Sequence, residues 1–218
     1  MKGRHEGGEN RYWGMKFLKE DEEAGRADIE DAARWGYGPA IATCKFEAWG
    51  RDEDNEGAVA LWRAELASNP SEKSGGECRW SAYYLAECYQ VGWGGVEQND
   101  ARAAEFYHKA ADEYGNSRAM HELADAYEWG WMELDQDEAE ALKYYRKASD
   151  AGYAHASGVL GKRYEHGKLG LDVNLVEAAR LYEIAKQRNT DNTTRWTRSL
   201  DRVQRKIAGT YESSSEES

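Results

Sequence analysis

Apolar and small residues recur along the chain with the spacing of one face of an α-helix. In the clearest segment a small residue, a leucine, a second small residue and a tyrosine stand at offsets of −4, 0, +1 and +4. These offsets share one side of a helix with 3.6 residues per turn. Ser81, Leu85, Ala86 and Tyr89 form this set. The pattern predicts a helix whose small residues let a second helix approach closely.

The same set returns 38 residues later and 37 residues after that. The three copies, each closed by a glycine, are Ser81, Leu85, Ala86, Tyr89 and Gly92, then Ala119, Leu123, Ala124, Tyr127 and Gly130, then Ala156, Leu160, Gly161, Tyr164 and Gly167. A second block repeats with the same period, as Val96, Asn99, Ala103, Phe106 and Tyr107, then Leu134, Asp137, Ala141, Tyr144 and Tyr145, then Leu171, Asn174, Ala178, Leu181 and Tyr182. Each unit is therefore predicted to be a pair of helices.

The residues between the paired helices match the needs of helix ends. The glycine three residues after each tyrosine stands where a left-handed C-terminal cap is wanted. A short polar side chain precedes each second helix, at Asn99, Asp137 and Asn174. Such a side chain is a preferred N-cap acceptor. We therefore expect each pair to be joined by a capped turn.

The whole pattern resembles a known family. The run Ala-x-x-x-Leu-Gly-x-x-Tyr-x-x-Gly, followed by an apolar residue, Asp or Asn, Ala, an aromatic pair and Lys-Ala-Ala, resembles the Sel-1-like repeat (SLR), a relative of the tetratricopeptide repeat (TPR). The closing element reads Lys109-Ala110-Ala111, then Lys147-Ala148-Ser149, and departs to Ile184-Ala185-Lys186 in the third copy. The resemblance implies an all-α fold, a right-handed superhelix of antiparallel helix pairs forming an SLR/TPR-like solenoid.

The repeats predict one solenoid over residues 12–208. Its parts are a half-repeat at 12–36, repeats at 37–76, 77–115, 116–152 and 153–188, and a capping helix at 193–208. The capping helix is indicated by Trp196, Leu200, Val203 and Ile207, whose spacing suits a helix that covers the last exposed face. We expect a flexible N-terminus at 1–11 and a disordered tail at 209–218, because both are polar.

The repeat at 37–76 is degenerate. Asp54, Ala58, Leu61 and Trp62 keep the second-helix spacing. Its first helix has two possible registers, with either Cys44 or Ala42 at the leucine position, and the sequence leaves both open.

Composition agrees with helix and limits the function. The chain has 31 Ala against 17 Val, Ile and Thr together, which favours helix over sheet. With 29 basic and 41 acidic residues the net charge is −12, which argues against nucleic-acid partners and anionic membranes. No apolar run approaches the roughly 18 residues that span a bilayer, and the first 15 residues lack the apolar stretch of a signal peptide. We therefore expect a cytoplasmic protein.

Candidate catalytic and metal-binding motifs are weak. The segment His121-Glu122-Leu123-Ala124-Asp125 resembles a zinc-binding His-Glu-x-x-His with Asp in place of the second His, but the sequence offers no third ligand. Cys44, Cys78 and Cys88 suit neither a disulfide scaffold nor a nucleophile, because no motif places His and acid beside them. We expect no metal, no cofactor and no enzymatic activity.

A partner surface is the remaining candidate. In these folds the first helices line the concave face, so side chains opposite the leucine should form a groove. The predicted groove contains Trp80, Tyr83, Tyr84, Glu87, His121, Glu122, Asp125, Trp129, His155 and Lys162. Tryptophan and tyrosine are enriched at interfaces, and the acids favour a basic partner. The alternative, that some of these aromatics pack between repeats, stays open.

Charge is distributed unevenly along the chain. Residues 116–142 carry a net −7 and residues 186–206 a net +5. The basic C-terminal helix could contact an acidic partner or the acidic middle of a second copy, giving self-association, or it could be a solvated helix.

The resemblance implies a protein- or peptide-binding adaptor or scaffold. Two alternatives remain. A small acidic cytosolic protein could act as an immunity protein that neutralises a basic toxin, as some bacterial proteins with similar repeats do. Some secreted SLR proteins are associated with β-lactam binding or hydrolysis, but those resemble cysteine-paired repeats with a signal peptide, and this chain has neither feature.

Overall fold

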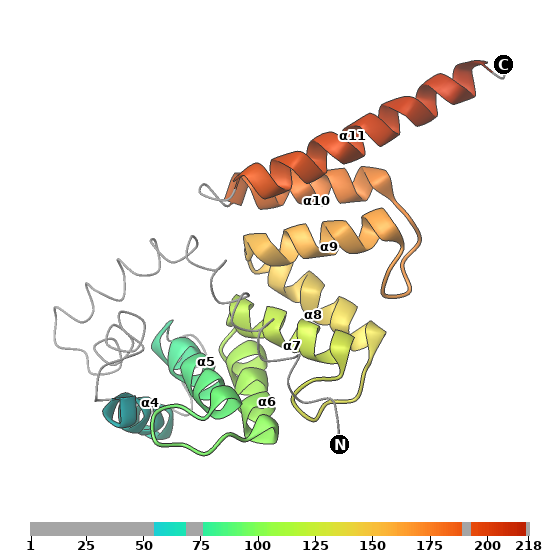
Figure 1. Ribbon diagram of the computed structural model, residues 1–218. Helices are drawn as coiled ribbons and strands as arrows, with labels where there is room; N and C mark the ends of the chain where they lie inside the picture. Colours follow the sequence, from blue (N-terminus) through green and yellow to red (C-terminus); the bar gives the residue numbers. More distant parts are fainter. Residues whose placement is uncertain (1–54, 69–75, 189–192, 217–218) are drawn as a thin grey trace.

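The computed structural model describes residues 55–68, 76–188 and 193–216 (Figure 1). The predicted N-terminal segment 1–11, the half-repeat 12–36 and the first helix of repeat 37–76 lie outside these residues. The helices are α4 (Asn55–Ser68), α5 (Gly76–Val91), α6 (Asp100–His108), α7 (Ser117–Trp129), α8 (Glu138–Asp150), α9 (Ala154–His166), α10 (Leu175–Arg188) and α11 (Thr193–Glu216). A π-helical turn, Lys109–Glu113, continues α6.

The helices stack in chain order from α4 at one end to α11 at the other (Figure 1). The pairs α5/α6, α7/α8 and α9/α10 are antiparallel, and the second helix of each pair also packs on the first helix of the next unit. The described residues form helices and connecting turns without a strand, which confirms the all-α prediction. The architecture is an α-solenoid.

The predicted caps are present. Gly92, Gly130 and Gly167 have φ of 77°, 67° and 62°, the left-handed conformation that ends a helix. The side chain of Asn99 accepts the backbone N–H of Arg102 at 2.8 Å. Asp137 and Asn174 cap α8 and α10 in the same way. These short polar interactions fix the turn between the helices of each pair.

The repeat leucines form the centre of the core. Leu85, Leu123 and Leu160 are buried. Of the repeat tyrosines Tyr89 is buried, whereas Tyr127 and Tyr164 are only half-buried. The small residues near each leucine are also buried, which agrees with the close helix approach that was expected. They are Ser81, Ala82, Ala86, Ala119, Ala124, Ala156 and Gly161.

The helix α11 covers the exposed end of the last repeat. Trp196, Leu200 and Val203 are buried against α10, as the capping prediction requires. Trp196 also fills the space above Gly158 on α9, where an added Cβ would lie 2.4 Å from its indole ring. Glycine at this position therefore lets the capping helix dock.

The capping helix is longer than predicted. It continues to Glu216, so a disordered tail beginning at 209 was the wrong prediction for residues 209–216. The prediction relied on the polarity of this segment. Polarity disfavours burial of a residue, but it does not stop a helix from continuing when no proline interrupts it. Figure 1 shows the end of α11 extending past α10.

The buried carboxylate of Glu165 holds the last helices together. The side chain of Glu165 on α9 accepts hydrogen bonds from Arg202 at 2.9 and 2.7 Å, from Lys206 at 2.8 Å and from the Tyr182 hydroxyl at 2.9 Å. Two of the cations that make the C-terminal segment basic are therefore engaged within the chain.

Candidate functional site

The predicted groove residues lie on α5, α7 and α9, at three levels of burial. Trp129 and Lys162 are exposed. Five are half-buried: Trp80, Glu87, Glu122, Asp125 and His155. The other three are buried: Tyr83, Tyr84 and His121.

Tyr83 and Tyr84 are core residues and not groove anchors, so their predicted role is wrong. Each is 2% exposed. Tyr84 stacks on Trp62 of α4 at a centroid distance of 5.3 Å, and Tyr83 meets the edge of Tyr107 of α6 at 5.8 Å. The helix α5 packs against both α4 and α6. The groove prediction considered the single face that carries the leucine, and it therefore underestimated how much of α5 is covered.

Trp80 links α5 to the next unit. Its ring stacks on Tyr84 at 5.9 Å, and the guanidinium of Arg118 from α7 lies 5.3 Å from its centroid. A cation over an indole face is attractive. Trp80 and Arg118 therefore form a half-buried contact between two first helices, which leaves Trp80 less available to a partner than predicted.

Two of the three groove acids, Glu87 and Asp125, accept hydrogen bonds from buried tyrosines. The Tyr83 hydroxyl donates to Glu87 Oε1 at 2.9 Å. Burial, and then the charges of Glu87 and Glu122, raise the pKa of Tyr83 well above its ordinary value. Tyr145 likewise donates to Asp125. Glu87 and Glu122 thus supply negative charge to this face, while Asp125 also serves the core.

His121 is a buried neutral imidazole. Its ring meets the edges of Tyr145 and Tyr153 at centroid distances of 5.6 and 5.4 Å and lies 5.0 Å from His155. Neither ring nitrogen has a hydrogen-bond partner in the described part of the chain. Burial, with a further contribution from Arg163, lowers its pKa to about 4. The His121 Nδ1 atom is 3.7 Å from Asp125 Oδ2, and the pair gains no third ligand of a metal site within the described residues.

A buried ion pair fixes the C-terminal end of α7. The Arg163 Nη2 atom of α9 donates to Glu128 Oε2 at 2.7 Å, and the Tyr145 hydroxyl of α8, which shares its single proton with Asp125, lies 2.8 Å from the same oxygen. Three helices therefore meet at the residue that precedes Trp129.

The exposed feature at this end is a pair of tryptophans. Trp129 is 54% exposed and Trp131 is 38% exposed, and their rings stack at a centroid distance of 6.4 Å with an interplanar angle of 27°. The backbone N–H of Trp131 donates to the backbone carbonyl of Ala126 at 2.9 Å. The next residue, Met132, is buried and has φ of 54°. The turn is thus anchored, and the two rings are held at the surface.

The sequence pattern identified Trp129 but missed Trp131. A signal was present, because the residue after the capping glycine is tryptophan in two of the three copies, Trp93 and Trp131, and both are exposed. A core residue at that position would instead be buried in each copy. The repeated exposed tryptophan is a feature of the loops and lies outside the helical face used for the groove prediction.

The Sel1 repeat model matches three segments of the chain, at residues 81–114, 117–153 and 156–189. These segments contain the helix pairs α5/α6, α7/α8 and α9/α10, with the buried leucine and the capped turn in each. The chain belongs to the Sel1 repeat family.

A solved structure has a similar fold. The Sel1 repeat protein from Oxalobacter formigenes is 24% identical, with a TM-score of 0.59 over 72% of this chain. The chain spans 59% of the length of that protein. The c5321 protein, a protective antigen present in uropathogenic Escherichia coli strains displaying an SLR fold, is 20% identical, with a TM-score of 0.38 over 84% of this chain and 48% of its own. The search of curated proteins found no match.

Two of the three cysteines of this Sel1 repeat protein lie in the core. Cys78 and Cys88 are buried free thiols, and burial raises the pKa of Cys88 to about 12, so this thiol stays protonated at neutral pH. Cys44 lies outside the described residues. Among the helices that the structure describes, none is long and apolar enough to cross a membrane.

Proposed function

We propose that this Sel1 repeat protein is an adaptor or scaffold that binds a protein or peptide through the tryptophan pair, Trp129 and Trp131. Sel1 repeats generally mediate protein–protein interactions. The observation that carries the proposal is the exposure of two stacked indoles on an anchored turn. Tryptophan is enriched among residues that dominate binding energy.

Rigidity supports the use of this pair as an anchor. The buried ion pair Glu128–Arg163 and the Met132 side chain fix the residues beside both tryptophans. A partner that buries the two rings therefore orders little of this chain, and the entropic cost of binding is lower than for a flexible loop.

The acids of the neighbouring helices favour a basic partner. Glu87 on α5 and Glu122 on α7 are half-buried on the first helices, and the chain carries a net charge of −12. Charges of one sign raise the association rate of an oppositely charged partner, and this effect weakens as salt is added. In this proposal the tryptophans hold the partner and the acids attract it.

A comparative pull-down tests the proposal. Tagged wild-type protein, Trp129→Ala and Val176→Ala are incubated with lysate of the source organism, and bound proteins are quantified by mass spectrometry. Val176 is an exposed apolar residue on α10 and serves as the control. We expect a protein that is retained by wild type and by Val176→Ala and is depleted about tenfold or more by Trp129→Ala.

The outcome also separates two roles. A retained protein that is a basic toxin or nuclease would favour the inhibitor, or immunity, function over a scaffold. Equal retention by wild type and Trp129→Ala would contradict the proposed anchor.

A further inference from the structure

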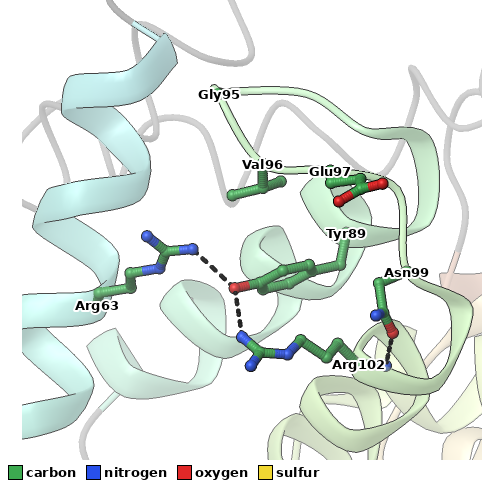
Figure 2. A pocket seen from close by; sticks show the side chains of 7 residues that line it. All are labelled: Arg63, Tyr89, Gly95, Val96, Glu97, Asn99 and Arg102. Atoms are coloured by element: carbon green, nitrogen blue, oxygen red, sulfur yellow. Dashed lines mark hydrogen bonds between the residues drawn. The ribbon is translucent and has the colours of Figure 1, made fainter.

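A second feature lies between α4, α5 and α6, away from the tryptophan pair of α7. It is a pocket of about 390 Å³ beneath the turn that joins α5 to α6. Figure 2 shows the arginines Arg63 of α4 and Arg102 of α6 converging on the hydroxyl of Tyr89. The turn forms one side of the pocket, which is open to solvent. The pocket is lined by Arg63, Tyr89, Gly95, Val96, Glu97, Asn99 and Arg102.

Both arginines donate to the same phenol oxygen. The Arg63 Nη2 atom lies 2.7 Å and the Arg102 Nη1 atom 3.1 Å from Tyr89 Oη. Burial opposes ionisation of Tyr89, but the hydrogen bonds from Arg102 and Arg63 outweigh it and lower its pKa below the ordinary value. The pocket is thus locally electropositive within an acidic protein.

The donors of this site exceed its acceptors. A guanidinium has five N–H donors, and each arginine uses one of them on Tyr89. Within the described residues neither arginine has a carboxylate partner, and the Tyr89 O–H has no acceptor for its own proton. Other tyrosine hydroxyls donate to an acid or an amide, as in Tyr83, Tyr107, Tyr144, Tyr145 and Tyr182.

The repeats provide an internal comparison. The position of Arg63 is taken by His108 and Arg146 in the following units, and each contacts the next repeat tyrosine, at 3.3 and 3.0 Å. A basic or imidazole group on the tyrosine is therefore common to the fold. The position of Arg102, three residues after the N-cap, is taken by Glu140 and Glu177.

Arg102 departs from this pattern against the local preference of the helix. An acid in the first turn interacts favourably with the helix dipole and can complete a capping box, whereas a cation there is unfavourable. In the third unit Glu177 supplies a negative charge near Arg146. The pKa of Glu177 is lowered, mainly by the hydrogen bond from Arg180 and to a smaller extent by the charge of Arg146. In the first unit two cations face each other across one phenol. Residues that break a local rule are expected where a site is built.

We propose that Arg63, Tyr89 and Arg102 form a binding site for an oxyanion, either free or as the terminal carboxylate of a peptide. The free guanidinium N–H groups and the Tyr89 O–H supply charge-assisted donors. The volume of about 390 Å³ accommodates an anionic group together with a small adjoining residue, and Val96 offers it an apolar wall.

Glu97 limits the affinity of this site. Its carboxylate also lines the pocket, so the charged lining sums to one net positive charge. The acid is common to the three turns, since Asp135 and Asp172 hold the same position. Replacing Arg102 with glutamate therefore reproduces the charge pattern of the third unit and should remove anion binding while the helix remains stable.

Titration of the full chain, followed by ¹H–¹⁵N NMR of arginine Nε–H and of the amides around residue 99, tests the site. The probes are inorganic phosphate, N-acetyl-triglycine and its C-terminal amide, with sodium chloride holding the ionic strength constant. The variants are Arg102→Glu, Arg63→Gln and Arg146→Gln. The last is the matched control, because Arg146 also donates to a repeat tyrosine.

We expect saturable shifts with phosphate or with the peptide acid and none with the amide. Arg102→Glu and Arg63→Gln should each weaken binding about tenfold or more, and Arg146→Gln should leave it within about twofold. Binding of phosphate without the peptide acid would assign a free oxyanion, and binding of the peptide acid would assign a terminal carboxylate. The absence of saturable shifts, or equal affinity in Arg102→Glu with its fold intact by circular dichroism, would overturn the proposal.

Discussion

The capping helix α11 should depend on the carboxylate of Glu165. This side chain is fully buried and accepts hydrogen bonds from Arg202 and Lys206 of α11 and from Tyr182 of α10. Glu165→Gln keeps the size of the side chain but removes its charge and presents an N–H₂ group to these donors. We predict that the substitution weakens the docking of α11 and destabilises the protein.

The magnitude follows from the titration of this group. The hydrogen bond from Arg202 contributes most, ahead of the opposing effect of burial, and with Lys206 and Tyr182 it lowers the pKa of Glu165 from 4.5 to about 2. One pKa unit corresponds to about 1.4 kcal/mol, so the lowering is worth about 3 kcal/mol. Solvent screening of the half-exposed Arg202 and Lys206 reduces this figure toward about 2 kcal/mol.

The effect should depend on pH in one direction. The folded-state pKa lies below the unfolded value, so the stabilisation is fully present above pH 4.5 and is lost as the pH falls through about 2. The stability difference between wild type and Glu165→Gln should therefore shrink by roughly 40% between pH 7 and pH 3.5.

Urea unfolding followed by circular dichroism measures this difference at both pH values. Glu183→Gln is the control, because Glu183 forms a half-exposed pair with Lys186 on α10 and should cost under about 0.5 kcal/mol. A loss below about 0.5 kcal/mol for Glu165→Gln at pH 7, or a difference that grows toward acid pH, would refute the reasoning.

Three further predictions concern the core. Leu123→Ala removes a fully buried side chain and should cost about 2 to 5 kcal/mol in urea unfolding; a loss well under about 1 kcal/mol would show that Leu123 does not pack as described. Gly158→Ala places a Cβ against the Trp196 ring and should cost about 1 to 3 kcal/mol and increase hydrogen exchange in α11, whereas unchanged stability and exchange would argue against the close contact. His121 should remain neutral in the folded state from pH 7.5 to 5.5, because its pKa is about 4. The unfolded chain takes up this proton below about pH 6.5, so the residue lowers stability as the pH falls from 6.5 to 4. An NMR titration midpoint near 6.5 would contradict its burial.

The repeat made the fold predictable from sequence. Leucine burial and glycine caps depend on contacts within a unit, and the same residue types return in each copy, as at Leu85 and Gly92. Local periodicity carries that information directly. The length of α11 was not predictable in this way, because the segment after Ile207 is mainly polar and offers no repeated apolar pattern to follow.

The candidate site was less predictable because burial depends on neighbouring units. On an isolated helix pair Tyr84 would lie outside the face that carries Leu85 and would be exposed. In the solenoid the indole of Trp62 from the preceding unit covers it. The position opposite one leucine defines the free face of an isolated helix pair only. The pocket at Arg102 could have been noticed by comparing aligned positions for charge, since its counterparts Glu140 and Glu177 carry the opposite sign.

Binding kinetics of the partner retained in the pull-down test the central claim most directly. Association and dissociation rates are measured at about 0.1 M and 1 M salt, where the Debye length falls from about 10 Å to about 3 Å. Trp129→Ala should mainly speed dissociation at both salt concentrations, and Glu122→Lys should mainly slow association, with an effect that fades at 1 M. Unchanged rates in both variants would contradict the account and place the interface elsewhere on the solenoid.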